Sequence, residues 1–222
     1  SSFAIFHQRF STNTAPAWHL AQPFRMIAHN GEINTLKGNV NWMRSHEIRM
    51  ASSAFGEAAE DIKPIIPSGT SDSGALDAVF EALVRSGRNA PLAKTMLVPE
   101  AWSKATTDMK PAWADMYAYC NSVIEPWDGP AALAMTDGRW VCGGLDRNGL
   151  RPMRYLTTHD GLVIAGSETG LVDLEESRIA ERSRLEDRAG LRRWIIFLVL
   201  CPLVTLANPY GWQPTLLTWS VV

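Results

Sequence analysis

Apolar residues recur at helical spacing in several stretches of the chain. The clearest pattern covers residues 72–85, where Ser71 or Asp72 can cap the first turn and Gly87 can follow the last. Its stripe consists of Leu76, Val79, Phe80, Leu83 and Val84. Because such a stripe buries one face, the pattern predicts an amphipathic helix over 72–85.

Three further stretches have shorter helical patterns. Apolar positions between residues 33 and 43 are spaced by three or four residues, and the stretches 91–96 and 111–124 each begin with a proline, which a first helical turn tolerates. In the last of these, the side chains expected to be buried are Met116, Tyr119, Cys120 and Val123. Each stretch is therefore predicted to be a helix.

Two short strands are predicted before and between these helices. Residues 3–10 alternate large apolar side chains with polar ones, which is typical of a strand that enters a loop. Residues 24–29 form a second apolar run, and the pair Asn30-Gly31 is expected to stop it at His29 with a tight turn.

Two consecutive hairpins are predicted after residue 130. In each, an Asp-Gly pair typical of tight turns separates two apolar runs. The runs are 131–135 and 139–145 in the first hairpin, and 152–157 and 162–167 in the second. Helices followed by hairpins indicate an α+β domain in which helices pack on antiparallel sheets.

Composition narrows the classes of partner. The 222 residues are 46% hydrophobic and 20% charged, with a formal net charge of -2 and both signs interspersed, so neither a nucleic-acid surface nor a polybasic membrane patch is indicated. The three cysteines form no CxxC pair, which argues against a disulfide framework or a zinc site and favours the cytoplasm. The first residues lack an initiating Met and a signal-peptide layout, so we expect a fragment.

The last part of the chain differs in composition. Residues 174–193 are dense in charge, whereas residues 194–207 are almost wholly apolar and are interrupted by Pro202. The apolar stretch is shorter than the about 20 residues that a membrane-spanning helix needs. A buried segment, a membrane-associated segment and foreign or frame-shifted sequence all remain open. We expect one domain over residues 1–185 and an unmatched tail over 186–222.

Three polar clusters are candidates for chemistry. Arg9, at the end of a predicted strand, can present its guanidinium to a carboxylate, although such an arginine is more often a solvated charge. Asn30 and Gly31 can supply an amide and a backbone N–H as two donors to an oxyanion, although Asn-Gly is more often only a turn. Asp72 can hold an ammonium group, although an Asp at a helix start is more often a cap.

In this order, the clusters resemble those of the class II glutamine amidotransferases, and among them the glutaminase domain of the glutamate synthases. The resemblance covers residues 3–172, and more loosely to about 185. Its motifs are HQRFSTNT at 7–14, AQPFR at 21–25, AHNGEINT at 28–35, SDS at 71–73, PEAW at 99–102, EPWDGP at 125–130, LDRNGLRP at 145–152 and Ser167-Glu168. It implies the N-terminal-nucleophile hydrolase fold, with stacked antiparallel sheets flanked by helices (αββα), incomplete at the N-terminus.

The resemblance also implies residue roles in the hydrolysis of L-glutamine to glutamate and ammonia. Arg9 would hold the α-carboxylate of the substrate and Asp72 its α-ammonium group. The Asn30 side chain and the Gly31 N–H would stabilise the oxyanion.

The same resemblance gives two further residues and the partners of the site. His29 and Thr12 would either shape the loop or contact the substrate. FMN, an iron–sulfur cluster and an electron-donating subunit would belong to other parts of the parent enzyme, which transfers the ammonia to 2-oxoglutarate. No cofactor or metal is expected in this chain.

The family's nucleophile is an N-terminal Cys whose own α-amine is the general base. Ser1 does not occupy its position, because the nucleophile lies on a strand well upstream. Cys120 and Cys142 fall on predicted apolar faces, which indicates core residues, and Cys201 lies in the unmatched tail. We therefore expect this chain alone to be inactive. The alternatives are a non-catalytic glutamine-binding remnant and a membrane-tethered chimeric protein.

Overall fold

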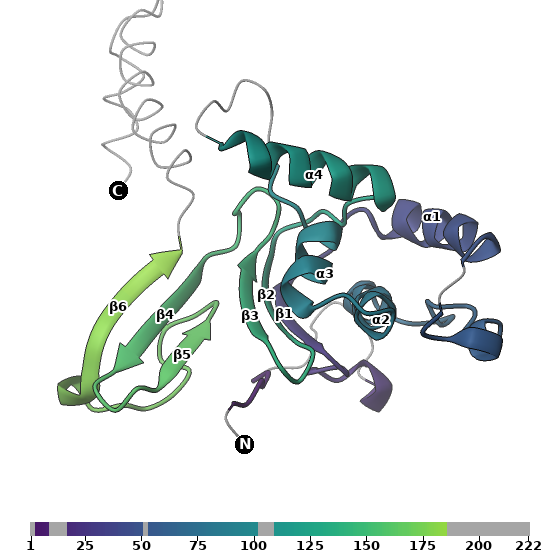
Figure 1. Ribbon diagram of the computed structural model, residues 1–222. Coiled ribbons are helices and arrows are strands. Elements are labelled where there is room, and N and C mark those ends of the chain that lie inside the picture. The colour runs from purple at the N-terminus through teal and green to yellow at the C-terminus, as the bar shows by residue number, and fades with distance from the viewer. Residues whose placement is uncertain (1–2, 9–16, 51–52, 102–108, 186–222) are drawn as a thin grey trace, which may run out of the picture. The chain divides into compact units, whose positions relative to one another are not determined.

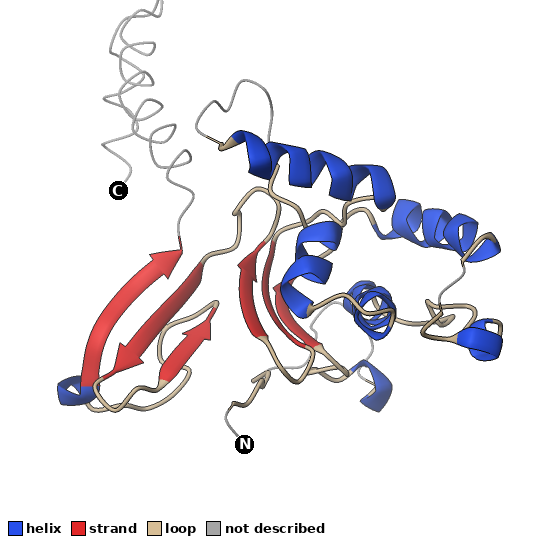
Figure 2. Cartoon of the chain, viewed as in Figure 1, coloured by secondary structure: helices blue, strands red, loops and turns tan. Residues whose placement is uncertain are grey.

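The computed structural model describes residues 3–8, 17–50, 53–101 and 109–185. Within this part the chain combines helices with two antiparallel sheets (Figure 1 and Figure 2). The helices are α1 (Leu36–Ile48), α2 (Asp72–Arg85), α3 (Ala90–Leu97) and α4 (Pro111–Val123), with 3-10 turns η1 (Trp18–Leu20), η2 (Gly56–Ala59) and η3 (Glu176–Arg178). The four predicted helices are confirmed.

Each sheet has three strands. The first has the order β1-β2-β3 and the second the order β5-β4-β6, and all pairs are antiparallel. The strands are β1 (Ile27–Gly31), β2 (Ala131–Thr136), β3 (Val141–Leu145), β4 (Met153–Thr158), β5 (Val163–Gly166) and β6 (Ile179–Leu185). Both predicted hairpins, β2–β3 and β4–β5, are confirmed, and the mixed α+β class with them.

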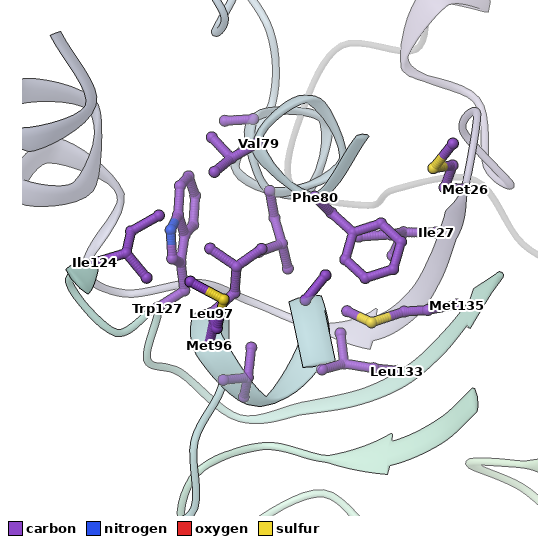
Figure 3. Packing of buried hydrophobic residues seen from close by; sticks show 14 of the residues in the cluster. Met26, Ile27, Val79, Phe80, Met96, Leu97, Ile124, Trp127, Leu133 and Met135 are labelled. Atoms are coloured by element: carbon purple, nitrogen blue, oxygen red, sulfur yellow. The ribbon is translucent and has the colours of Figure 1, made fainter. Parts of the chain in front are cut away.

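One face of the first sheet forms the hydrophobic core with α2 and α3. Along β1, Ile27 faces this core and is fully buried, and Phe80 of α2 lies beside it (Figure 3). Trp127, only 2% exposed, packs at the other end of the same cluster, near Ile124 (Figure 3). Helix α2 begins where the sequence predicts, because the Ser71 hydroxyl accepts a hydrogen bond from Gly74 N at 3.1 Å.

The opposite face of the first sheet contacts the second sheet. Asn30 of β1 bonds to Ser167, which follows β5, and a methyl group added at Gly143 of β3 would lie 2.8 Å from Met153 Sδ of β4. Side chains alternate between the two faces of a strand, so Asn30 and Ile27 point to opposite sides of β1. The helices and the second sheet therefore cover different faces of the first sheet.

Two strand predictions were wrong. Residues 3–8 form no strand, since a strand requires a hydrogen-bonded neighbour and no ladder joins these residues to the described part of the chain. Strand β1 does not stop at His29 but continues through Asn30 and Gly31, because Gly31 pairs with Ala131 of β2 instead of turning.

One further expectation was wrong. In α4, Cys120 is buried but Met116 and Tyr119 are 39% and 59% exposed, because α3 is the main described element that packs against this helix. The charge-dense stretch 174–193, for which the sequence predicted no element, contains strand β6, and this strand pairs with β4. Glu181 and Arg182 of β6 are exposed, so their charges do not oppose strand formation.

No helix in the described part of the chain is both long and apolar enough to cross a membrane. Residues 194–207, the apolar stretch of the tail, lie outside the described residues.

Candidate functional site

The outer edge of β1 presents a row of backbone N–H groups. Thr136 N donates to Met26 O at 2.9 Å, and Glu32 N donates to Pro130 O at 3.0 Å. Hydrogen-bonded and non-hydrogen-bonded pairs alternate in an antiparallel ladder, so the N–H groups of residues 28, 30 and 32 point toward β2, whereas Met26 bonds to β2 only through its carbonyl. The N–H groups of residues 27, 29, 31 and 33 therefore point away from β2.

Side-chain oxygens accept hydrogen bonds from three of these four outward N–H groups. The bonds are Ile27 N to Asp77 Oδ1 at 3.0 Å, His29 N to Gln22 Oε1 at 2.7 Å, and Ile33 N to Asp72 Oδ2 at 2.8 Å. Buried backbone N–H groups almost always find an acceptor, and here carboxylates and an amide supply it on a strand edge. The outward N–H groups on both sides of Gly31 therefore have hydrogen-bond acceptors.

Gly31 N–H is the exception in this row, because no acceptor among the described residues takes it. The residue has a φ of 153°, and a Cβ built on it would lie 1.8 Å from Pro130 O. Only glycine therefore fits this position. Its backbone N–H points outward from the sheet edge as a donor for a ligand.

The Asn30 side chain lies directly beside this donor. Its Nδ2 donates to Ser167 Oγ at 3.0 Å and lies 3.5 Å from Glu168 Oε1. The Glu168 carboxylate only accepts hydrogen bonds, which favours the nitrogen end of the amide on the side of Ser167 and Glu168. One amide and one backbone N–H thus come from neighbouring residues, as an oxyanion hole requires.

Asp72, the first residue of α2, lies next along the strand edge. Its Oδ2 accepts from Ile33 N, and its Oδ1 has no hydrogen bond to a described residue. A carboxylate at a helix N-terminus is stabilised by the helix dipole. One of its oxygens therefore holds the backbone, while the other is available to a cationic group.

His29 is buried on the other face of β1 from Asn30. The residue is only 6% exposed, and its Nδ1 has no hydrogen-bond partner among the described residues. Burial lowers the pKa of His29; Asp72 opposes this shift, and His7 and Arg151 add to it. The imidazole is therefore neutral at pH 7, and it lies close enough to Asp72 to sense its charge.

Two residues of the site were not among the predicted ones. Asp77, only 2% exposed, accepts from Met26 N at 2.9 Å as well as from Ile27 N, and burial raises its pKa. In the sequence, Asp77 could have been recognised as an acidic residue that lies between the apolar positions of a helical stripe. Ser167 follows β5, and only the motif Ser167-Glu168 marked it.

The structure brings together four of the six predicted site residues. Asn30, Gly31, His29 and Asp72 lie along one short stretch of β1 and the start of α2. Arg9 and Thr12 lie outside the described residues. Within the described ranges, no group of three His, Cys, Asp or Glu side chains could hold a metal ion.

Neither described cysteine lies at this stretch. Cys120 is fully buried in α4, and burial raises its pKa. Cys142 of β3 pairs with Met135, which pairs with Ile27, so it lies at the far end of the sheet from Gly31. Gly31 lies four residue steps along the strand from Ile27, a span of about 13 Å. Burial also raises the pKa of Cys142.

The chain is similar to known proteins over most of its length. A family model described as glutamine amidotransferases class-II matches residues 1–190. The large chain of NADPH glutamate synthase from Azospirillum brasilense is 65% identical over 187 residues, which are 83% of this chain and 12% of that protein. The corresponding chain from Bacillus subtilis is 47% identical over 186 residues, 84% of this chain and 12% of the relative.

A eukaryotic relative gives the same result. NADH glutamate synthase from Schizosaccharomyces pombe is 50% identical over 188 residues, 83% of this chain and 9% of that protein. The chain therefore spans 12% or less of the length of these three relatives. The family match over residues 1–190, together with the paired donors of Asn30 and Gly31, shows that this chain belongs to the class-II glutamine amidotransferases.

Proposed function

We propose that this chain is the glutamine amidotransferase part of a glutamate synthase, and that within the parent enzyme this part takes part in the hydrolysis of the side-chain amide of L-glutamine to glutamate and ammonia. One observation carries the proposal: Gly31 N–H is the one outward donor of residues 27–33 without an acceptor among the described residues, and it lies beside the Asn30 amide. The tetrahedral intermediate of amide hydrolysis carries its negative charge on the former carbonyl oxygen, and two such donors can stabilise that oxyanion.

Each end of glutamine has a matching group in this proposal. The Asn30 amide and the Gly31 N–H stabilise the oxyanion, and loss of one such donor costs about 10²- to 10³-fold in rate. Asp72 binds the α-ammonium group through its open oxygen, and Arg9 binds the α-carboxylate as a bidentate pair. Addition of water across the C–N bond then leaves glutamate and ammonia.

His29 has a supporting role in the proposal. Its side chain lies on the opposite face of β1 from Asn30, and it is buried and neutral. We therefore assign it to shaping the strand edge near Asp72. Thr12 stays a predicted substrate contact.

The nucleophile in this proposal comes from outside the described residues, because Cys120 and Cys142 are remote from Gly31. We expect the 222-residue polypeptide itself to bind glutamine without releasing ammonia. The glutamine-binding remnant is the second candidate, and the positions of these two thiols favour it for the isolated polypeptide. Calorimetric titration with glutamine and an ammonia assay on the same sample distinguish binding from turnover.

The remaining parts of the proposal concern the parent enzyme. Residues 1–185 belong to a four-layer αββα domain, and residues 186–222 are not assigned to it. FMN, the iron–sulfur cluster and the electron-donating subunit interact with other domains, which receive the ammonia for 2-oxoglutarate. The proposed location is the cytoplasm.

A chimaeric enzyme tests the proposal. The matched segment of the Azospirillum brasilense large chain, 65% identical, is replaced by the corresponding residues of this chain, and glutamine-dependent release of glutamate and ammonia is measured. The unsubstituted chimaera should be active. Asn30→Ala should lower kcat by about 10²- to 10³-fold with little change in KM, since the oxyanion forms only in the reaction.

Asp72→Ala should instead raise the KM for glutamine by at least about tenfold, because a charge-assisted contact to bound substrate is lost. Asp115→Ala is the matched control, since Asp115 is an exposed carboxylate on α4. An inactive chimaera, or equal activity of Asn30→Ala and the control, would refute the proposed function.

A further inference from the structure

Ser167 connects the second sheet to the candidate oxyanion hole. It follows β5, and its Oγ lies 3.0 Å from Asn30 Nδ2 across 137 residues of sequence. We propose that Ser167 is a positioning residue that sets the orientation of the Asn30 amide, an inference that rests on the proposed function. The catalytic donor itself remains Asn30.

The geometry selects one end of the amide. The side chain of Asn30 ends in an oxygen and an NH₂ group, which differ only by a half-turn about the last torsion, and that torsion is broad and roughly two-fold. Ser167 Oγ and the carboxylate of Glu168 both lie on the Nδ2 side. The Ser167 hydroxyl can accept or donate, whereas the Glu168 carboxylate only accepts, so Glu168 disfavours the amide orientation that would place Oδ1 there and Ser167 holds the Nδ2 that results.

One hydrogen of the NH₂ group then remains for the substrate. Ser167 Oγ accepts a hydrogen bond from one of the two hydrogens, with 3.0 Å between Nδ2 and Oγ. Glu168 Oε1 lies 3.5 Å from Nδ2, which is the limit of a hydrogen bond. The hydrogen bond to Ser167 therefore fixes the plane of the Asn30 amide, and the second hydrogen on Nδ2 points in a defined direction. A reversed amide would place an oxygen lone pair against the oxyanion.

Ser167 is itself held in place by the turn that follows β5. A Cβ added at Gly166 would lie 2.0 Å from Leu171 Cδ1, so the leucine covers Gly166 and closes this turn. The backbone carbonyl of Leu171 also accepts from Gln8 Nε2 at 3.4 Å. The residue before Ser167 is therefore packed against Leu171 of the same turn.

The inference is tested in the chimaeric enzyme with Ser167→Ala. We expect kcat for glutamine hydrolysis to fall about 10- to 100-fold, because a misplaced catalytic group costs rate at this scale, while the KM stays within about twofold. Ser167→Thr retains the hydroxyl and should restore most of the activity. Ser177→Ala, an exposed serine that bonds only to Glu175 at 3.5 Å among the described residues, is the control.

A double-mutant cycle shows whether Ser167 acts through Asn30. In the Asn30→Ala background, Ser167→Ala should have almost no further effect on kcat, since the group that it orients is gone. An equal loss in both backgrounds, or an unchanged kcat in Ser167→Ala, would overturn the inference while the proposed function stands. Absence of activity in the unsubstituted chimaera would refute the proposed function and this inference together.

Discussion

Asp77 is the carboxylate that holds the beginning of β1, and its removal should destabilise the protein strongly. In Asp77→Ala, the buried N–H groups of Met26 and Ile27 lose the acceptor that they now reach at 2.9 and 3.0 Å. Alanine offers no replacement, and water has little access because Asp77 is only 2% exposed.

The size of the effect follows from these two bonds. An unsatisfied buried donor costs about 1–3 kcal/mol, so two donors cost about 2–6 kcal/mol. Removing a buried charge relieves part of this, because burial of the carboxylate is itself unfavourable. We expect a net loss of about 2–4 kcal/mol in the free energy of unfolding at pH 7.

Urea unfolding followed by tryptophan fluorescence measures this loss, since Trp127 is buried in the same core. The control is Asp115→Ala, which removes an exposed carboxylate and should change the free energy of unfolding by less than about 0.5 kcal/mol. A loss in Asp77→Ala no larger than in the control would show that the two N–H groups do not depend on Asp77.

The same residue predicts a pH dependence. Burial raises the pKa of Asp77, so the native state keeps this proton to a higher pH than the unfolded state does. Between the two pKa values the native state binds more protons, and its stability falls as the pH rises. Relative to Asp77→Asn, the unsubstituted protein should therefore lose stability as the pH rises above about 4, the ordinary value. A gain over this range would contradict the sign.

Three further substitutions test the local geometry by urea unfolding. Gly31→Ala should cost at least about 2–3 kcal/mol, because its Cβ would lie 1.8 Å from Pro130 O, and unchanged stability would refute the close approach. Gly38→Ala should stabilise α1 by about 0.5–1 kcal/mol, since its Cβ meets nothing within 4 Å; a loss would indicate a missed contact. Ser71→Ala should cost about 1 kcal/mol by removing the acceptor of Gly74 N, and no cost would mean that another group caps α2.

Local signals predicted the helices and hairpins well. For α2, the cap at Ser71, the apolar stripe and Gly87 all agree, and the helix is found over Asp72–Arg85 as expected. The Asp-Gly turns likewise placed both hairpins. These signals act within a few residues, so they can be detected in one sequence without knowledge of the fold.

The features that define the site depend on distant contacts. Which N–H groups of β1 point outward depends on its pairing with β2, and Asp77 bonds Met26 across 51 residues. The contact of Ser167 with Asn30 spans 137 residues. The Asn-Gly pair was therefore taken as a turn, because nothing near it in the sequence shows that Pro130 and Ala131 pair with it.

The outer edge of β1 also determines which backbone amide a bound ligand would protect from hydrogen exchange. An exposed strand edge is a template for unwanted pairing with other chains, and side chains of the described residues accept hydrogen bonds at every outward position of residues 27–33 except Gly31. A bound substrate would fill that one gap and complete the edge. Hydrogen exchange at the single amide of Gly31 would then report occupancy of the site, even in a polypeptide that performs no turnover.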